Sequence, residues 1–368
     1  MNNKKLNILQ VLPALESGGV ERGTLEIAEY IVKKGHNSYV ISSGGRLVKK
    51  LIEGGSKHFQ LSIGHKSPFA LFTIFKLLKI YKEHNIDIVH ARSRLPAWLV
   101  FLSLKFIFFR DRPKFVTTIH GYNSISFYSS IMTKGDVVII VSNALKNFIF
   151  KNYKINKTKV FVNHRGVEDL TKKFNQSHMS KWETKWTKEN QYLKNKIILT
   201  LPARISRHKG IEDFIYLIKF LKSKKINIHG LIVGEANSKK YLTKLQKFIK
   251  ANYLEDQISL LGYRSDIYEI MSISDITFSL SSLPEAFGRT VIESIKLGTP
   301  VIGYNHGGVG EQLKIIFPEG MIKKNNKKDL TKKTLNFIKN KPQVKKTTLF
   351  SLENMQKNTL NIYLRVMS

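Results

Sequence analysis

The chain has 368 residues, of which 42% are hydrophobic, and this length suits two α/β domains better than one core. It contains no cysteine, which excludes disulfides and thiolate metal sites. The formal net charge of +34 could attract nucleic acid, anionic lipid or an anionic substrate, and it could equally reflect a lysine-rich coding bias.

The first half of the chain alternates short apolar runs of strand character with helical patterns, which predicts a parallel sheet with helical crossovers. The beginning of the sequence runs straight into the first strand pattern and lacks the apolar core of a signal peptide, so we expect a cytoplasmic protein. The expected strands are Leu6–Leu12, Tyr39–Ser42, Ile86–His90, Phe115–His120, Val137–Val141 and Val160–Val162.

Two apolar segments in this half raise the question of a membrane. The longest, Leu95 to Phe109, is shorter than the roughly 20 residues of a spanning helix, so we expect it to pack on the sheet. The segment from Phe69 to Lys82 mixes Phe72 and Phe75 with lysines. We expect a helix packed on the sheet with its lysines outward, and the alternative is a helix lying on a membrane surface.

The second half repeats the α/β alternation after a polar stretch. Residues from Leu170 to Asn195 have no strand period and are expected to form a linker with some helix. The expected domains are 1–169, then a linker at 170–195, a second domain at 196–348 and a last helix at 349–368 that could cross back to the first domain. The strands expected in the second domain are Ile197–Leu201, Ile228–Val233, Ile258–Leu260, Ile276–Leu280 and Val301–Tyr304.

The strongest local motif runs from Ser281 to Glu293, directly after a strand and into a helix. Its glycine allows close backbone approach to a ligand, and the helix N-terminus beyond offers unpaired N–H groups to a diphosphate. Glu293, inside this helix, could accept hydrogen bonds from ribose hydroxyls, and Glu285 from sugar hydroxyls. Read alone, the motif could also be a loop shaped by proline and glycine with a solvated glutamate.

A second motif places Arg204 and Lys209 at a comparable strand end, because it follows the first strand of the second half. Two cations there could neutralise a leaving diphosphate as its charge develops. In so lysine-rich a chain, a chance basic pair is the alternative.

These motifs have the forms A-R-x-x-x-x-K-G and E-A-F-G-x-x-x-x-E, and weaker matches precede them in order. With them, the chain resembles glycosyltransferase family four over nearly its whole length. The resemblance implies an α/β GT-B fold, in which two Rossmann-like parallel-sheet domains face a central cleft, and sugar transfer with retention of anomeric configuration. The weaker matches are Gly18–Arg22, Val89–Trp98, Thr117–Gly121, Asp136–Ser142 and Arg165–Val167.

Position by position, the resemblance implies that Arg204 and Lys209 hold the diphosphate and act in catalysis, and that Glu293 binds the ribose. It implies that Glu285, with the backbone of Phe287, Gly288 and Arg289, holds the transferred sugar. In the first domain, Gly18 and Gly19 match a loop that closes over the donor phosphate, and His120 matches a histidine near the reacting sugar.

Two segments depart from the family pattern. The sequence around Asn163 and His164 differs from the commoner P-N-G-V-D form, so neither residue receives a role. The segment before Glu311 lacks a proline that often stands there, which leaves the role of Glu311 open.

The chain has no D-x-D sequence to carry a metal-bound nucleotide, and we expect a metal-independent hexosyltransferase. It also lacks the P-loop, zincin, G-x-S-x-G and G-x-G-x-x-G motifs. The alternatives are a nucleotide-sugar epimerase of the same fold and a non-enzymatic basic membrane-binding protein on this scaffold.

We expect no cofactor and no bound metal, with a nucleotide sugar as co-substrate and a UDP-sugar as the leading choice. The expected acceptor is a glycan or a lipid-linked molecule, in the synthesis of lipopolysaccharide or another cell-surface glycan. The basic charge suits peripheral contact with an anionic membrane at its cytoplasmic face. Interleaved basic and aromatic residues of a nucleic-acid groove are not apparent, so no nucleic-acid partner is expected.

Overall fold

The computed structural model describes residues 5–16, 18–64, 70–108, 110–170, 176–345 and 347–368. The chain divides into two compact units, the first formed by Met1–Gly166 with Glu353–Ser368 and the second by Val167–Leu352. Phe69 and Phe109, which limit the two apolar segments above, lie outside the described residues.

The described residues of the first unit form a seven-stranded parallel sheet with the order β3-β2-β1-β4-β5-β6-β7. Strands β4 and β6 are buried along their whole length, as expected where helices cover both faces of a parallel sheet. The strands are β1 (Asn7–Val11), β2 (Asn37–Ser42), β3 (Lys57–Gln60), β4 (Ile88–Ala91), β5 (Lys114–Ile119), β6 (Val137–Ile140) and β7 (Val160–Val162).

Helices connect these strands, and the first part of the apolar segment after β4 packs as one of them, whereas Phe106 and Phe108 near its end are 68% and 85% exposed. Helix α4 buries Ala97, Leu99 and Val100, and the 3-10 turn Leu104–Phe106 follows it. No helix among the described residues is both long and apolar enough to span a membrane. The helices are α1 (Gly19–Lys33), α2 (Val48–Glu53), α3 (Ala70–Glu83), α4 (Arg94–Ser103), α5 (Phe127–Ser130) and α6 (Asn143–Asn152).

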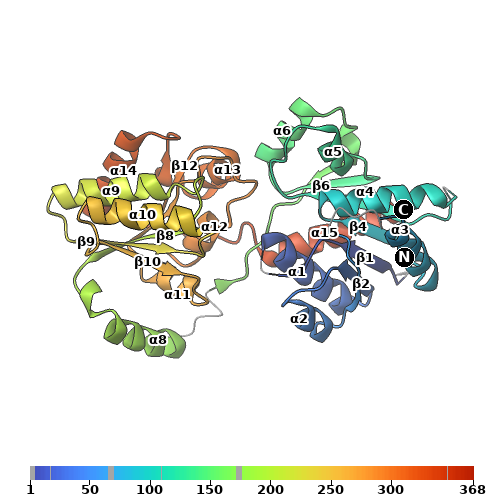
Figure 1. Cartoon of the computed structure of the whole chain (residues 1–368), viewed down its shortest axis with the longest axis horizontal. Coiled ribbons are helices and arrows are strands. Elements are labelled where there is room, and N and C mark those ends of the chain that lie inside the picture. The colour runs from blue at the N-terminus through green and yellow to red at the C-terminus, as the bar shows by residue number, and fades with distance from the viewer. Residues whose placement is uncertain (1–4, 17, 65–69, 109, 171–175, 346) are drawn as a thin grey trace. The chain divides into compact units, whose positions relative to one another are not determined.

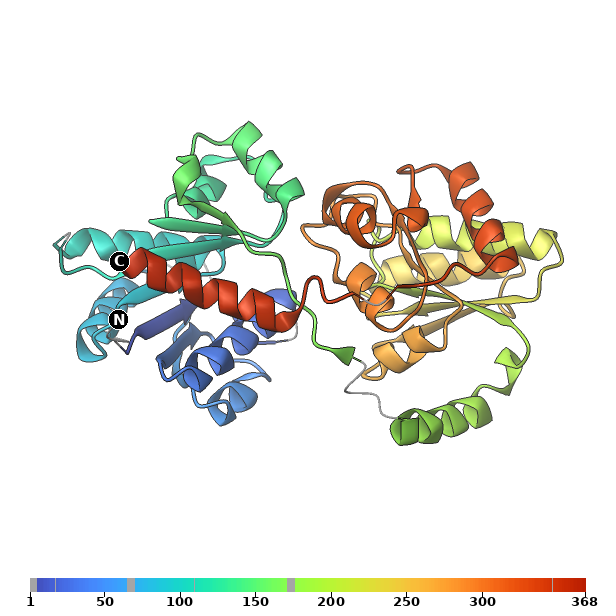
Figure 2. The same cartoon turned by 180° about the vertical axis from the view of Figure 1, so that it is seen from behind.

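The last helix, α15 (Leu352–Met367), completes the first unit, and Figure 2 shows it lying across the first sheet. Its buried Tyr363 places its hydroxyl 2.6 Å from Nδ1 of His90, which is itself 1% exposed. Asn163 donates to Oγ1 of Thr359 at 2.8 Å and to the carbonyl of Met355 at 3.0 Å. Asn163 therefore fastens α15 to the end of β7.

The second unit contains a six-stranded parallel sheet with the order β10-β9-β8-β11-β12-β13. Figure 1 shows α9 and α10 on one face of this sheet and α11 on the other. The strands are β8 (Ile197–Pro202), β9 (Ile228–Val233), β10 (Ile258–Gly262), β11 (Ile276–Ser279), β12 (Val301–Tyr304) and β13 (Met321–Ile322). The helices are α8 (Gln176–Glu189), α9 (Ile211–Ser223), α10 (Lys239–Ala251), α11 (Ile267–Ser272), α12 (Arg289–Lys296), α13 (Gly307–Ile316) and α14 (Lys327–Lys339).

The stretch from Leu170 to Asn195, expected as a linker with some helix, falls within the second unit, and most of its described part is helix α8. Trp186 of α8 is 6% exposed and packs in one apolar cluster with Leu231 and Val233 of β9 and Ile270 of α11. The stretch is polar overall, but the apolar faces of Trp182 and Trp186 provide its packing against the second unit.

We expect Tyr363→Phe to lower the free energy of unfolding of the first unit by about 1–3 kcal/mol, because it leaves Nδ1 of His90 buried without its hydroxyl partner. Urea unfolding followed by circular dichroism measures this change. The nearby exposed variant Leu364→Ser should stay within about 0.5 kcal/mol of wild type. Equal unfolding midpoints for wild type and Tyr363→Phe would contradict the expectation.

Candidate functional site

The candidate residues fall into two groups, one in each unit. Gly18, Gly19 and His120 belong to the first unit. The larger group belongs to the second unit and follows the carboxyl ends of β8 and β11, where ligands bind in open parallel sheets. Its members are Arg204, Lys209, Glu285, Phe287, Gly288, Arg289 and Glu293.

The loop after β8 is pressed against the end of β11. Gly210 has a left-handed φ of 72°, and a Cβ there would lie 2.1 Å from the carbonyl oxygen of Leu280. The carbonyl of His208 accepts hydrogen bonds from the Ser282 amide at 2.8 Å and from Oγ of Ser281 at 3.0 Å. Only glycine permits this approach.

This packing brings Lys209 and Glu285 together although 76 residues separate them. The Lys209 ammonium lies 2.7 Å from Oε1 of Glu285, and both side chains are about three-quarters buried, with 28% and 24% exposed. Arg204, at the start of the same loop, is exposed and makes no hydrogen bond or ion pair within the described part of the chain. One cation is thus held by a carboxylate and a second is open to an anion.

Helix α12 begins beside this pair without a side-chain cap. Its N-cap, Gly288, has a left-handed φ of 82°, and its first-turn N–H groups lack intrahelical partners. A Cβ at Gly288 would lie 2.5 Å from Cγ2 of Val309, so this position also requires glycine. The helix N-terminus carries a partial positive charge that favours an anion.

The backbone and the side chain of Phe287 have different surroundings. Its ring is 4% exposed and packs edge-on against Phe350, with 5.5 Å between ring centroids. Gln312 donates to the carbonyl of Phe287, and the Gly308 amide donates to the carbonyl of Glu285 at 2.7 Å. The ring therefore anchors the loop, and only the backbone here is available to a ligand.

Glu293, one turn into α12, has one carboxylate oxygen fixed and the other open. Oε1 accepts from the Tyr268 hydroxyl and from Nε of Arg289, each at 3.1 Å. Oε2 has no partner within the described ranges. A carboxylate oriented in this way can accept hydrogen bonds from ligand hydroxyls.

In the first unit, Gly18 is the N-cap of α1 and Gly19 is its first residue. The Gly19 carbonyl accepts from Nη2 of Arg165 at 3.3 Å, and the same nitrogen lies 3.0 Å from Nδ1 of His120. A Cβ at Gly23 would lie 2.0 Å from Arg165 Nη1, so a glycine in α1 makes room for this guanidinium. Arg165 therefore connects His120 to the start of α1 at Gly19.

The His120 ring is held in one protonation state by these surroundings. Burial, together with the charge of Arg165, lowers the pKa of His120 well below its usual value, so the ring is neutral at pH 7. A guanidinium only donates hydrogen bonds, so Nδ1 is the acceptor and Nε2 carries the proton. Nε2 is buried without a partner in the described structure and borders a small cavity that Arg92 and His90 also line.

Two contacts were not predicted from sequence. Arg165 was noted only as part of a motif, and Tyr268 was not singled out. Both act across more than 20 residues of sequence, and no spacing pattern marks either contact. Asn163, which received no role, supports α15.

Within the ranges that the structure describes, no group of three or more histidine and acidic side chains could hold a metal ion.

Comparisons with known proteins cover almost the whole chain. The family Glycosyltransferase Family 4 matches residues 17–169, and the family Glycosyl transferases group 1 matches residues 183–351. The crystal structure of a glycosyltransferase from Rickettsia africae is 33% identical, with a TM-score of 0.87 and 99% of each chain covered. The structure of Anabaena Alr3699/HepE in complex with UDP and glucose is 17% identical, with a TM-score of 0.81, and the match covers 98% of this chain and all of that one.

Two curated relatives share about a quarter of their residues with this chain. The N-acetyl-alpha-D-glucosaminyl L-malate synthase of Bacillus anthracis is 24% identical over 314 residues, which are 81% of this chain and 78% of that protein. A second is the N,N'-diacetylbacillosaminyl-diphospho-undecaprenol alpha-1,3-N-acetylgalactosaminyltransferase of Campylobacter jejuni, 24% identical over 315 residues and 80% of each chain. The fold, the two family matches and the relative at 33% identity agree, and the chain belongs to the GT-B glycosyltransferases of family four.

Proposed function

We propose that this glycosyltransferase takes its sugar from a nucleoside diphosphate sugar bound to the second unit. The observation that carries the proposal is that Arg204, the Lys209–Glu285 pair and the uncapped N-terminus of α12 follow two neighbouring strands. Cations and a helix N-terminus favour a diphosphate, and the open Oε2 of Glu293 suits a ribose. UDP is the preferred nucleotide, and the complex of the Anabaena neighbour with UDP and glucose supports this choice.

Catalysis in this proposal is stabilisation of the leaving group. The acceptor hydroxyl oxygen forms a bond to the anomeric carbon on the face from which the diphosphate departs, and the bond from that carbon to the phosphate oxygen breaks. The departing phosphate oxygen takes the acceptor proton, so the sugar keeps its anomeric configuration. Arg204, Lys209 and the α12 amides balance the developing charge without a metal ion.

The remaining candidates receive the roles that the family resemblance implies. Glu285 and the backbone at Phe287, Gly288 and Arg289 hold the transferred sugar. Gly18 and Gly19 contact the donor phosphate, and neutral His120 lies near the reacting sugar as a hydrogen-bond donor rather than a general base. The matching motifs support these assignments, and the lowered pKa of His120 supports its role as a hydrogen-bond donor.

We propose a lipid-linked acceptor in the synthesis of lipopolysaccharide or another cell-surface glycan. The Campylobacter relative, whose name includes a diphospho-undecaprenol, supports this class. Phe72 and Phe75 of α3 are 64% and 63% exposed, and Lys76 and Lys79 beside them are also exposed. A helix with such a face, in a protein of net charge +34, suits peripheral contact with an anionic membrane at its cytoplasmic side.

Calorimetry against UDP-, GDP-, ADP- and dTDP-sugars in EDTA tests the donor site. We expect one nucleotide to bind wild type without metal, and Glu293→Ala and Arg204→Ala to weaken it about tenfold or more, because each removes a charged hydrogen-bonding group. Exposed Arg207→Ala, in the same loop as Arg204, is the matched control. Failure of all four nucleotides, or equal binding by both variants, would remove the donor-site assignment.

Vesicle co-sedimentation tests the membrane surface. We expect wild type to bind phosphatidylglycerol vesicles and not phosphatidylcholine vesicles, and Phe72→Ser/Phe75→Ser to bind about tenfold more weakly because it removes two apolar side chains from the lipid interface. Tyr253→Ser, which replaces an 81% exposed aromatic residue of the second unit, should bind like wild type. Undiminished binding by the double variant would contradict the role of α3.

Arg165→Gln tests the state of His120. Removal of the guanidinium charge should raise the pKa of His120, although burial keeps it below the usual value. Histidine-selective NMR measures both this pKa and the tautomer, which in wild type should be the neutral ring protonated at Nε2 at pH 6 and above. A charged His120 ring in wild type at pH 6, or an unchanged pKa in the variant, would refute this picture.

A further inference from the structure

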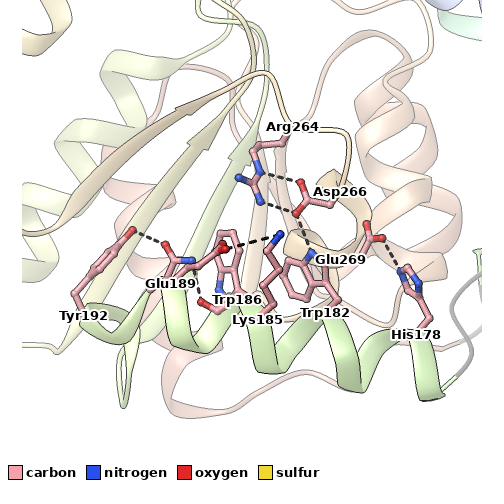
Figure 3. A network of polar contacts seen from close by, with 10 residues as sticks. His178, Trp182, Lys185, Trp186, Glu189, Tyr192, Arg264, Asp266 and Glu269 are labelled. Carbon is pink, nitrogen blue, oxygen red and sulfur yellow. Dashed lines mark hydrogen bonds and ion pairs between the residues drawn. The ribbon is translucent and has the colours of Figure 1, made fainter.

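Helix α8 is fastened to the segment before α11 by a shared carboxylate, as Figure 3 shows. Nε1 of Trp182 donates to Oδ2 of Asp266 at 2.8 Å, and Arg264 donates to the two oxygens of Asp266 at 2.8 and 2.6 Å. Burial acts to raise the pKa of Asp266, but the hydrogen bonds from Arg264 and Trp182 outweigh it and lower this pKa. Asp266 is therefore ionised at neutral pH and stands at the N-cap of α11.

A second contact and two ring interactions complete the attachment. Nε2 of His178 lies 3.0 Å from Oε1 of Glu269, which is 8% exposed. Trp182 and Trp186 stack with centroids 5.1 Å apart, and the Arg264 guanidinium lies 5.4 Å from the centroid of a Trp186 ring. We call these contacts of His178, Trp182 and Trp186 the α8 clamp, which holds α11 at both Asp266 and Glu269.

Tyr268 of α11 lies in sequence between Asp266 and Glu269, and its side chain contacts Glu293. The Tyr268 hydroxyl donates to Oε1 of Glu293 at 3.1 Å, and Arg289 Nε donates to the same oxygen. Glu293 is only 13% exposed, so few conformations are open to it. Both donors on one oxygen leave the other as the acceptor for a ligand.

We propose that Tyr268, held in place by the α8 clamp, is a positioning residue that presents Oε2 of Glu293 to the ribose hydroxyls of the donor. The inference rests on the proposed function, in which Glu293 binds the ribose. Tyr268 acts through Glu293 and is not itself a catalytic residue. Its contribution is preorganisation, because a carboxylate already fixed in its binding orientation loses less freedom when the nucleotide arrives.

This role predicts an effect that depends on the ribose hydroxyls. In calorimetry with UDP, Tyr268→Phe should raise Kd about tenfold, because the fixed orientation of Glu293 loses one of its two donors. With 2′,3′-dideoxy-UDP, wild type and Tyr268→Phe should bind alike, since the hydroxyls that Glu293 would contact are missing. Tyr268→Phe added to Glu293→Ala should cause no further loss with UDP.

The clamp is tested by Trp182→Phe, which keeps an aromatic ring for stacking and removes the donor to Asp266. We expect a Kd for UDP raised about threefold, a smaller effect than that of Tyr268→Phe because Arg264 still holds Asp266. The matched control is Lys185→Ala on the same helix, whose exposed pair with Glu189 does not touch α11. It should bind UDP like wild type.

The outcomes separate this inference from the function on which it rests. Loss of UDP binding in Glu293→Ala, with unchanged binding in Tyr268→Phe, would overturn the positioning role and leave the donor site intact. Equal weakening of UDP and dideoxy-UDP by Tyr268→Phe would also overturn it, because the change would then be a general structural one. Trp182→Phe binding like Lys185→Ala would overturn the part played by the clamp. If UDP fails to bind wild type, or binds Glu293→Ala equally well, the ribose assignment fails and this inference fails with it.

Discussion

Backbone atoms of the loops after β8, β11 and β12 touch one another without an intervening side chain, and the candidate donor site depends on these contacts. Gly210 lies against the carbonyl of Leu280, and a Cβ at Gly308 would be 2.5 Å from Cα of Phe287. Because the carboxyl ends of parallel strands share one edge of the sheet, such loops meet, and glycine sets how closely. Lys209 and Glu285 form their ion pair between two of these loops.

The electrostatics of the site follow from local pairing more than from the net charge of +34. Lys209 is paired with a carboxylate, and Arg204 is exposed and free among the described residues. A partly exposed ion pair contributes little to the free energy of unfolding. The main effect of the Lys209–Glu285 pair is therefore to fix the positions of these two side chains. In the proposed donor complex, a diphosphate would meet one paired cation, one exposed and unpaired cation, and a helix N-terminus.

Sequence patterns predicted the central strands of both sheets. Apolar runs marked β1, β4, β8 and β9 because both faces of those strands are buried. The edge strand β3 (Lys57–Gln60) was missed because its residues are exposed or half-buried, and β13 (Met321–Ile322) is too short to show a period. The motif from Glu285 to Glu293 is contiguous in sequence, so its residues could be proposed together, and their roles stay a prediction. The contacts of Arg165 and Tyr268 depend on how distant segments pack, which no spacing encodes.

Two helices outside the alternating β/α pattern, α15 and α8, are fixed to their units in the same physical way. Each combines apolar packing with a few buried or half-buried polar groups: His90 and Asn163 against α15, Asp266 and Glu269 against α8. Such groups add little net free energy when satisfied, but a helix shifted by one residue would leave them unpaired, at a cost of several kcal/mol. Apolar packing alone tolerates such a shift better, so the polar contacts specify the position of each helix. In our proposal, the position of α8 fixes α11, and Tyr268 of α11 in turn orients the Glu293 carboxylate of the candidate donor site.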